Sequence, residues 1–173
     1  ISFNQDLSSW DVSSVTVMSF MFYEASSFNG DLSSWDVSSV ASMYVMFNNA
    51  SSFNQDLSSW DVSSVIDMDF MFDSANALSD ENKCAIHISF SSNNVWPYDW
   101  SGLCYQPQDS AVLQTAVNLW VSNNSTALST YGEINTWDVS LITDMSDLFQ
   151  NKTNFNDDIG NWDVSNVTDM TDM

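Results

Sequence analysis

The chain has 173 residues, of which 44% are hydrophobic, and this is enough for one or two small cores. Its formal net charge is −21 with only two basic residues, Lys83 and Lys152, beside one histidine, so nucleic acid is excluded as a partner because its phosphates would repel the chain. No apolar run reaches the roughly 18 residues of a membrane-spanning helix, so we expect no membrane span in this sequence.

The phrase Trp-Asp-Val-Ser recurs along the chain. It begins at Trp10, Trp35 and Trp60, and again at Trp137 and Trp162, with a period of 25 residues within each group. The 77 residues from Trp60 to Trp137 do not fit that period, so two arrays are separated by a different segment. A fixed period of this length is typical of stacked coils, because one coil alone cannot bury its apolar residues.

Each repeat combines three local patterns. Apolar and polar residues alternate over residues 10–15, which favours a short strand. Residues 18–25 carry apolar side chains at helical spacing, which favours one or two helical turns. Turn-forming residues follow and return the chain to the next strand. The sequence therefore predicts an α/β solenoid of right-handed, leucine-rich-repeat-like coils with a parallel strand column, capped by a disulfide loop and a short helical segment.

The full repeat, F-N-x-D-L-S-S-W-D-V-S-S-V-x-x-M-x-x-M-F-x-x-A, resembles the BspA-like surface-protein repeats, a leucine-rich-repeat-like family of bacterial surface lipoproteins and algal proteins. The resemblance covers about residues 1–78 and 133–173. It implies display at the cell surface or outside the cell. The molecular activity of that family is largely undefined, so the resemblance implies no reaction.

Residues 79–132 interrupt the repeats and contain both cysteines, Cys84 and Cys104. We interpret residues 1–78 as the C-terminal part of a first array and 79–108 as its C-terminal cap, stapled by a disulfide bond. A bond closing a loop of this size contributes about 3 kcal/mol to stability, and such bonds are typical of secreted domains. Two reduced, buried cysteines are the alternative.

Residues 109–132 are predicted to form a helical N-terminal cap for a second array, residues 133–173. An amphipathic helix is expected over residues 109–122, with Asp109 or Ser110 as its N-cap. A second short helix is expected from Ser125 to Tyr131, where Gly132 ends it. The apolar stripe of the first helix comprises Val112, Leu113, Ala116, Val117, Trp120 and Val121.

Five N-glycosylation sequons begin at Asn49, Asn123, Asn124, Asn151 and Asn166. Asn49 and Asn151 rank first because both stand fourteen residues after a repeat tryptophan, at a position that elsewhere holds polar residues. Covalent glycans and an extracellular or cell-surface location are therefore predicted. In a bacterium, most of these sequons would be inert.

Aspartate recurs in columns, one of which comprises Asp11, Asp36 and Asp61. Stacked carboxylates about 5 Å apart repel one another, so each is expected to accept hydrogen bonds from its own turn. Calcium bridging neighbouring coils is the alternative, and these three aspartates are its candidate ligands. No other cofactor is expected. A parallel column, Asn4, Asn29, Asn54 and Asn156, is predicted to tie loop backbone together.

No catalytic motif is present, and the acids are spaced periodically as scaffold residues are, so we expect no enzyme. The favoured hypothesis is an extracellular structural or adhesive repeat glycoprotein, a subunit or segment of a surface fibre. Both ends of the sequence fall inside a repeat, which favours a piece of a longer protein with tandem modules or head-to-tail self-association. One alternative is a recognition module that binds a glycan or protein partner; a less favoured one is ice or mineral binding through serine rows such as Ser33 and Ser34.

Overall fold

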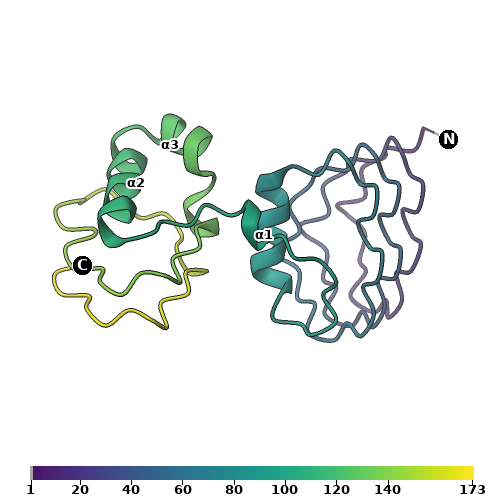
Figure 1. Ribbon diagram of the computed structural model, residues 1–173. Helices are drawn as coiled ribbons and strands as arrows, with labels where there is room; N and C mark the ends of the chain where they lie inside the picture. Colours follow the sequence, from purple (N-terminus) through teal and green to yellow (C-terminus); the bar gives the residue numbers. More distant parts are fainter. Residues whose placement is uncertain (1) are drawn as a thin grey trace. The chain divides into compact units, whose positions relative to one another are not determined.

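The computed structural model describes residues 2–173, which form two compact units (Figure 1). The first unit ends at Ser101, and the second runs from Gly102 to Met173. Cys84 and Cys104 are disulfide-bonded and are the only cysteines of the chain. The predicted disulfide bond is therefore present, and the alternative of reduced cysteines is wrong.

Successive repeats of the first unit lie side by side as stacked coils, drawn from purple to teal in Figure 1. The backbone N–H of Met18 donates to the carbonyl of Ser42 in the next coil at 2.9 Å, and Met43 donates likewise to Asp67 at 2.9 Å. Every second residue continues this ladder. Along this side of the stack, N–H groups therefore point toward the following coil and carbonyl groups toward the preceding one. The further donors are Phe20, Phe22 and Glu24 in one coil and Val45, Phe47 and Asn49 in the next.

The predicted parallel strand column is wrong, and with it the assignment to an α/β solenoid. Residues 2–173 contain no strand. Adjacent coils pair instead through isolated parallel bridges, which join Val17 to Ser42, Ser42 to Asp67, and Asp144 to Asp169. The parallel pairing of neighbouring repeats is thus reduced to single bridges between turns.

Tight turns replace the predicted strand at the start of each repeat. The Asp11 carboxylate accepts hydrogen bonds from the backbone N–H of Ser13 at 3.1 Å and from its hydroxyl at 2.7 Å. The N–H of Val15 then donates to the carbonyl of Val12 at 2.8 Å. Local bonds of this kind compete with a sheet ladder, so the alternating pattern of residues 10–15 is folded into turns.

The predicted helical turns at residues 18–25 are also wrong, because left-handed residues interrupt them. In the first coil these are Phe20, with φ 61°, and Glu24, with φ 57°. An α-helix requires φ near −63° at every residue, so no helix can pass through these positions. Among residues 2–173, every positive-φ residue other than glycine falls ten or fourteen residues after a repeat tryptophan, in both units: Phe20, Glu24, Val45, Asn49, Phe70, Ser74, Asp147, Asn151 and Asp172.

The core of the first unit is a column of aromatic rings that runs through the coils. The Phe47 ring stacks on that of Phe22 at 5.2 Å and on that of Phe72 at 5.5 Å between ring centroids. Phe28 and Phe53 form a second buried column at 6.2 Å. Each ring therefore packs against its own equivalent in the next coil, and a repeating sequence yields a continuous core.

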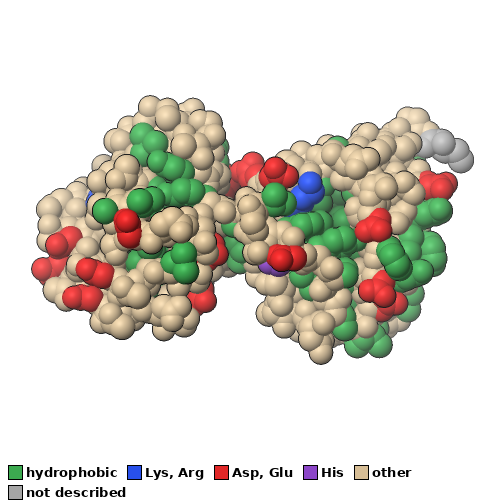
Figure 2. Space-filling model, viewed as in Figure 1, with side chains coloured by type: hydrophobic (Ala, Val, Ile, Leu, Met, Phe, Trp, Pro, Cys, Tyr) green, Lys and Arg blue, Asp and Glu red, His purple; other side chains and the backbone are tan. Residues whose placement is uncertain are grey.

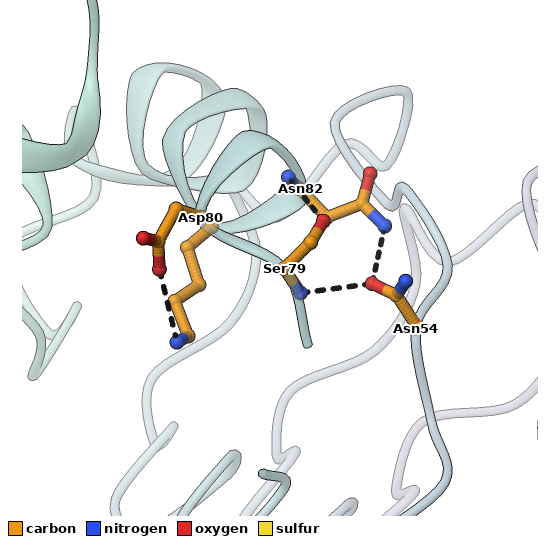
Figure 3. Close-up of polar contacts among 5 residues, drawn as sticks. Asn54, Ser79, Asp80 and Asn82 are labelled. Atoms are coloured by element: carbon orange, nitrogen blue, oxygen red, sulfur yellow. Dashed lines mark hydrogen bonds and ion pairs between the residues drawn. The ribbon is translucent and has the colours of Figure 1, made fainter. Parts of the chain in front are cut away.

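Helix α1, Asp80–Phe90, covers the last coil of the first unit. Ser79 is its N-cap and accepts a hydrogen bond from the N–H of Asn82. The Asn54 side-chain oxygen accepts from both the Ser79 N–H at 2.9 Å and the Asn82 amide at 2.8 Å, while Lys83 pairs with Asp80 at 3.5 Å (Figure 3). A residue of the last coil thus fixes the start of the helix.

The second unit begins with helices α2, Ser110–Ser122, and α3, Asn124–Tyr131. Asp109 is the N-cap of α2 and Gly132, with φ 71°, follows α3, so both predicted helices are confirmed. Asn123 ends α2 and caps α3. Short 3₁₀ turns at Ser101–Leu103 (η1) and Ile134–Thr136 (η2) flank the pair. A separate core forms around Trp137, Leu113, Val117, Met145 and Ile142.

Candidate functional site

The recurring polar side chains are used within the scaffold. The indole N–H of Trp60 donates to the carbonyl of Leu32 in the preceding coil at 3.0 Å, and Trp35 and Trp162 make the equivalent bonds. The side-chain oxygen of Asn29 accepts from the N–H of Asn54 at 2.7 Å. The predicted asparagine ladder is therefore present in the first unit. Groups committed in this way are not available to bind a ligand.

Each cap supplies the hydrogen-bonding groups that a neighbouring coil would otherwise supply to the coil that it covers. In the second unit the Ser110 hydroxyl donates to the carbonyl of Asp144, and the Gln114 amide donates to that of Leu148 at 3.1 Å. These carbonyls occupy the repeat positions that accept from a preceding coil in the first unit. Helix α2 therefore supplies the donors that a preceding coil supplies elsewhere.

The cap of the first unit supplies an acceptor instead. The N–H of Phe72 donates to the Tyr98 hydroxyl at 2.8 Å, where the equivalent N–H of Phe47 donates to the carbonyl of Met71 in a following coil. The Tyr98 hydroxyl in turn donates to the carboxylate of Asp73 at 2.9 Å. Burial raises the pKa of Tyr98, so its hydroxyl keeps its proton and the donation to Asp73.

The candidate calcium ligands each bind their own turn. Hydrogen bonds from Ser13, Ser38 and Ser63 lower the pKa of Asp11, Asp36 and Asp61 respectively. The neighbouring carboxylates raise the pKa of Asp36, but by less than Ser38 lowers it. Among residues 2–173 no group of three or more acidic, histidine or cysteine side chains is placed to hold a metal ion. The aspartate column is therefore a row of Asx turns.

The sequon asparagines all lie at the surface: Asn49, Asn123, Asn124, Asn151 and Asn166 are exposed. Asn49 and Asn151 have φ 59° and 62°, which places both on the same left-handed turn of their repeats. Asn123 caps α3 through its side-chain oxygen, whereas the amide of Asn166 donates to the carbonyl of Ser140 at 2.8 Å. Asn49 and Asn151 are thus the sequon positions at which the repeats of both units present the same side chain on the same turn.

A cleft of about 470 Å³ lies between the third coil and the end of α1. It is lined by Trp60, Asp61, Ser63, Ser89 and Asn93, with neighbouring residues. The Asn93 amide donates to two carbonyls of the coil, and Asp61 accepts from Ser63, so both polar groups are engaged. His87 lies outside this lining and accepts the indole N–H of Trp96 at 3.1 Å. The Asn93 amide and the Asp61 carboxylate of this cleft are therefore held within the scaffold and form no acid–base pair that could act on a substrate.

Another surface of the first unit carries aromatic side chains that the scaffold does not bury. Phe20, Tyr23 and Phe70 are about half exposed, and Tyr44 lies between the two phenylalanines. Figure 2 shows hydrophobic side chains reaching the surface of this unit with carboxylates beside them. Sequence reasoning missed this feature, because it assigned residues 18–25 to one or two helical turns. The signal was available as aromatic residues at repeat positions that vary from coil to coil.

No helix among residues 2–173 is long and apolar enough to cross a membrane. The structure defines a repeat protein made of stacked coils of tight turns. Caps complete the hydrogen bonds at the ends of the coils, and the recurring side chains join one coil to the next. The chain belongs to the family described as "Mycoplasma protein of unknown function, DUF285", whose model matches residues 1–85 and 116–173. No curated protein and no solved structure matches it.

Proposed function

We propose that the chain is a non-enzymatic structural and adhesive module of an extracellular or cell-surface protein. The observation that carries the proposal is the use of the recurring residues: tryptophan, asparagine and aspartate side chains join or shape the coils. A chain whose polar repeats are consumed in this way offers a scaffold rather than a reaction site. The resemblance of the repeat to BspA-like surface proteins supports display at the cell surface.

Two features support the location. The Cys84–Cys104 bond suits an oxidising compartment, because disulfide bonds seldom persist in the cytosol. The five exposed sequons suit passage through a secretory pathway. Mass spectrometry of the native protein tests the second point. With only two basic residues, trypsin is unsuited, and chymotryptic peptides should carry glycan at Asn49 and Asn151 and none at Asn54, which is not in a sequon.

Self-association is the structural half of the proposal. Coils stack through a directional ladder, so a head-to-tail contact between modules forms an open filament when it does not close into a ring. Electron microscopy and sedimentation velocity of the protein purified from its source should show oligomers that lengthen with concentration. Isolated globular particles at every concentration would contradict this half of the proposal.

Recognition of a partner is the second candidate function, and one observation favours it. The exposed aromatic residues of the first unit lie outside the buried core and leave ring surface open to solvent. Ice or mineral binding through serine rows has less support, because the Ser34 and Ser59 hydroxyls donate to carbonyls of the preceding coil at 3.1 and 3.0 Å. Their donor capacity is thus directed into the scaffold.

A further inference from the structure

An exposed row of aromatic rings, which we call the aromatic row, crosses the three coils of the first unit. It comprises Phe20, Tyr23, Tyr44 and Phe70. The Tyr44 ring lies 5.3 Å from that of Phe20 and 6.2 Å from that of Phe70, and Tyr23 extends the row at 5.9 Å from Phe20. Phe20 and Phe70 are 53% and 52% exposed, so half of each ring surface faces water.

The backbone conformation at Phe20 and Phe70 is unusual for phenylalanine. Both residues have positive φ, at 61° and 57°, a conformation that costs a bulky residue about 1 kcal/mol or more. At the same repeat position the second unit has Asp147 and Asp172, which tolerate that conformation better. The two rings pack against Tyr44 across the coils and leave about half of their surface open to a partner.

The surroundings of the aromatic row are acidic. A hollow of about 510 Å³ is lined by Asp67, Asp69 and Trp96, together with Ile66 and Pro97. Asp69 holds in the third coil the repeat position that Tyr44 holds in the second. The Asp69 carboxylate accepts no hydrogen bond from any of residues 2–173, whereas one Asp67 oxygen accepts the N–H of Asp69 at 3.1 Å. Lys83, the only lysine of the first unit, pairs with Asp80 at 3.5 Å.

We propose that the aromatic row and the adjoining hollow dock a segment of a partner protein that carries arginine or lysine side chains. Cations bind the faces of aromatic rings, and the free carboxylate of Asp69 would accept their N–H groups. Neighbouring rings are turned by 78° and 81°, so they offer no flat platform for the stacked sugars of a glycan. The inference rests on the adhesive half of the proposed function and names the chemistry of its partner.

The full chain should be titrated into fluorescently labelled hexa-arginine at about 0.15 M salt, with hexa-citrulline as the uncharged probe of the same shape. Wild-type protein is expected to bind hexa-arginine and not hexa-citrulline. Asp69→Asn should weaken binding about tenfold, and Tyr44→Ser about three- to tenfold. Serine occupies that repeat position at Ser19, so the fold accepts Tyr44→Ser.

The matched control separates docking from general attraction to an acidic protein. Asp31→Asn removes one exposed charge at another part of the same unit and should leave affinity unchanged. Equal losses in Asp31→Asn and Asp69→Asn, or equal binding of both peptides, would overturn the proposal. So would Tyr44-dependent binding of chitohexaose in place of hexa-arginine. Sedimentation is measured separately, so a failure here leaves the structural half of the proposed function standing.

Discussion

The two units place different residues at the same left-handed turn. Ten residues after the repeat tryptophan, the first unit has Phe20, Val45 and Phe70, and the second has Asp147 and Asp172. Only Val45 is buried, at 7% exposure. The comparison teaches that one backbone conformation carries either a strained apolar residue or a polar residue suited to it. The scaffold therefore sets the turn, and the surface chemistry varies on it.

The two units also differ in how tightly their cores are packed. Removing a core ring should have the largest effect on the free energy of unfolding. Phe47 and Phe149 share one repeat position, but Phe47 is fully buried and stacks on a ring in both adjacent coils, whereas Phe149 is partly exposed. We expect Phe47→Ala to cost about 3–5 kcal/mol of unfolding free energy and Phe149→Ala clearly less. Urea denaturation of both variants followed by circular dichroism measures the difference; equal losses would mean that column stacking adds nothing.

The tryptophan ladder tests the same comparison within one unit. Trp60 is buried and donates its indole N–H to Leu32, whereas Trp10 is 53% exposed and makes no such bond in residues 2–173. We expect Trp60→Phe to cost about 1–3 kcal/mol, because the Leu32 carbonyl then lacks its donor. Trp10→Phe should change stability by less than about 0.5 kcal/mol. If thermal unfolding showed Trp10→Phe to be the more destabilising variant, the tryptophan hydrogen bonds would not contribute to stability as proposed.

The type of residue at the left-handed turn can be exchanged between the two units. Phe70→Asn should raise the unfolding free energy by about 1 kcal/mol, because asparagine tolerates positive φ and little ring surface is lost from the core. Asp147→Phe is the reciprocal change and should lower it by a similar amount. Differential scanning calorimetry of the pair checks both signs, and a loss of stability in Phe70→Asn would show that the exposed ring serves the fold.

Sequence reasoning found what depends on spacing and missed what depends on turn geometry. The period of 25 residues predicted stacked coils, which the bonds from Trp35, Trp60 and Trp162 to the preceding coil join, and the stripe in residues 109–122 predicted helix α2. The alternation at residues 10–15 predicted a strand, but Asp11 and Ser13 form a local turn there. Periodicity reports which side chains are buried and cannot report which backbone conformation buries them.

Two further features were beyond the sequence for the same reason. Helix α1 was not predicted, because its buried residues Cys84, Ala85, Ile86 and Phe90 form no regular helical stripe. The left-handed residues were missed because phenylalanine and valine seldom adopt positive φ. The sequence showed aromatic residues at variable repeat positions, but their exposure followed only from the left-handed backbone.

The effect of acid should be the smallest, and its sign follows from the Asx turns. Serine or threonine hydrogen bonds lower the folded-state pKa of Asp11, Asp36 and Asp61 in the first unit, and of Asp163 and Asp169 in the second, below the ordinary value of an aspartate. A carboxylate whose pKa is lower in the folded state stabilises that state when the pH is above its pKa in the unfolded chain. The contribution is lost as the pH falls through its pKa in the folded state.

We therefore expect the melting temperature to fall between pH 5 and pH 2 in both units, against an opposing gain from relief of the −21 net charge. Salt separates the two effects, because screening weakens the repulsion of exposed carboxylates far more than a hydrogen bond between adjacent residues. At about 0.5 M salt the fall should remain. Ser38→Ala removes the largest cause of the lowered pKa of Asp36 and should reduce the fall, whereas Ser39→Ala, one residue away and outside that bond, should not. A melting temperature that rises on acidification at high salt would contradict a stabilising role for the Asx turns.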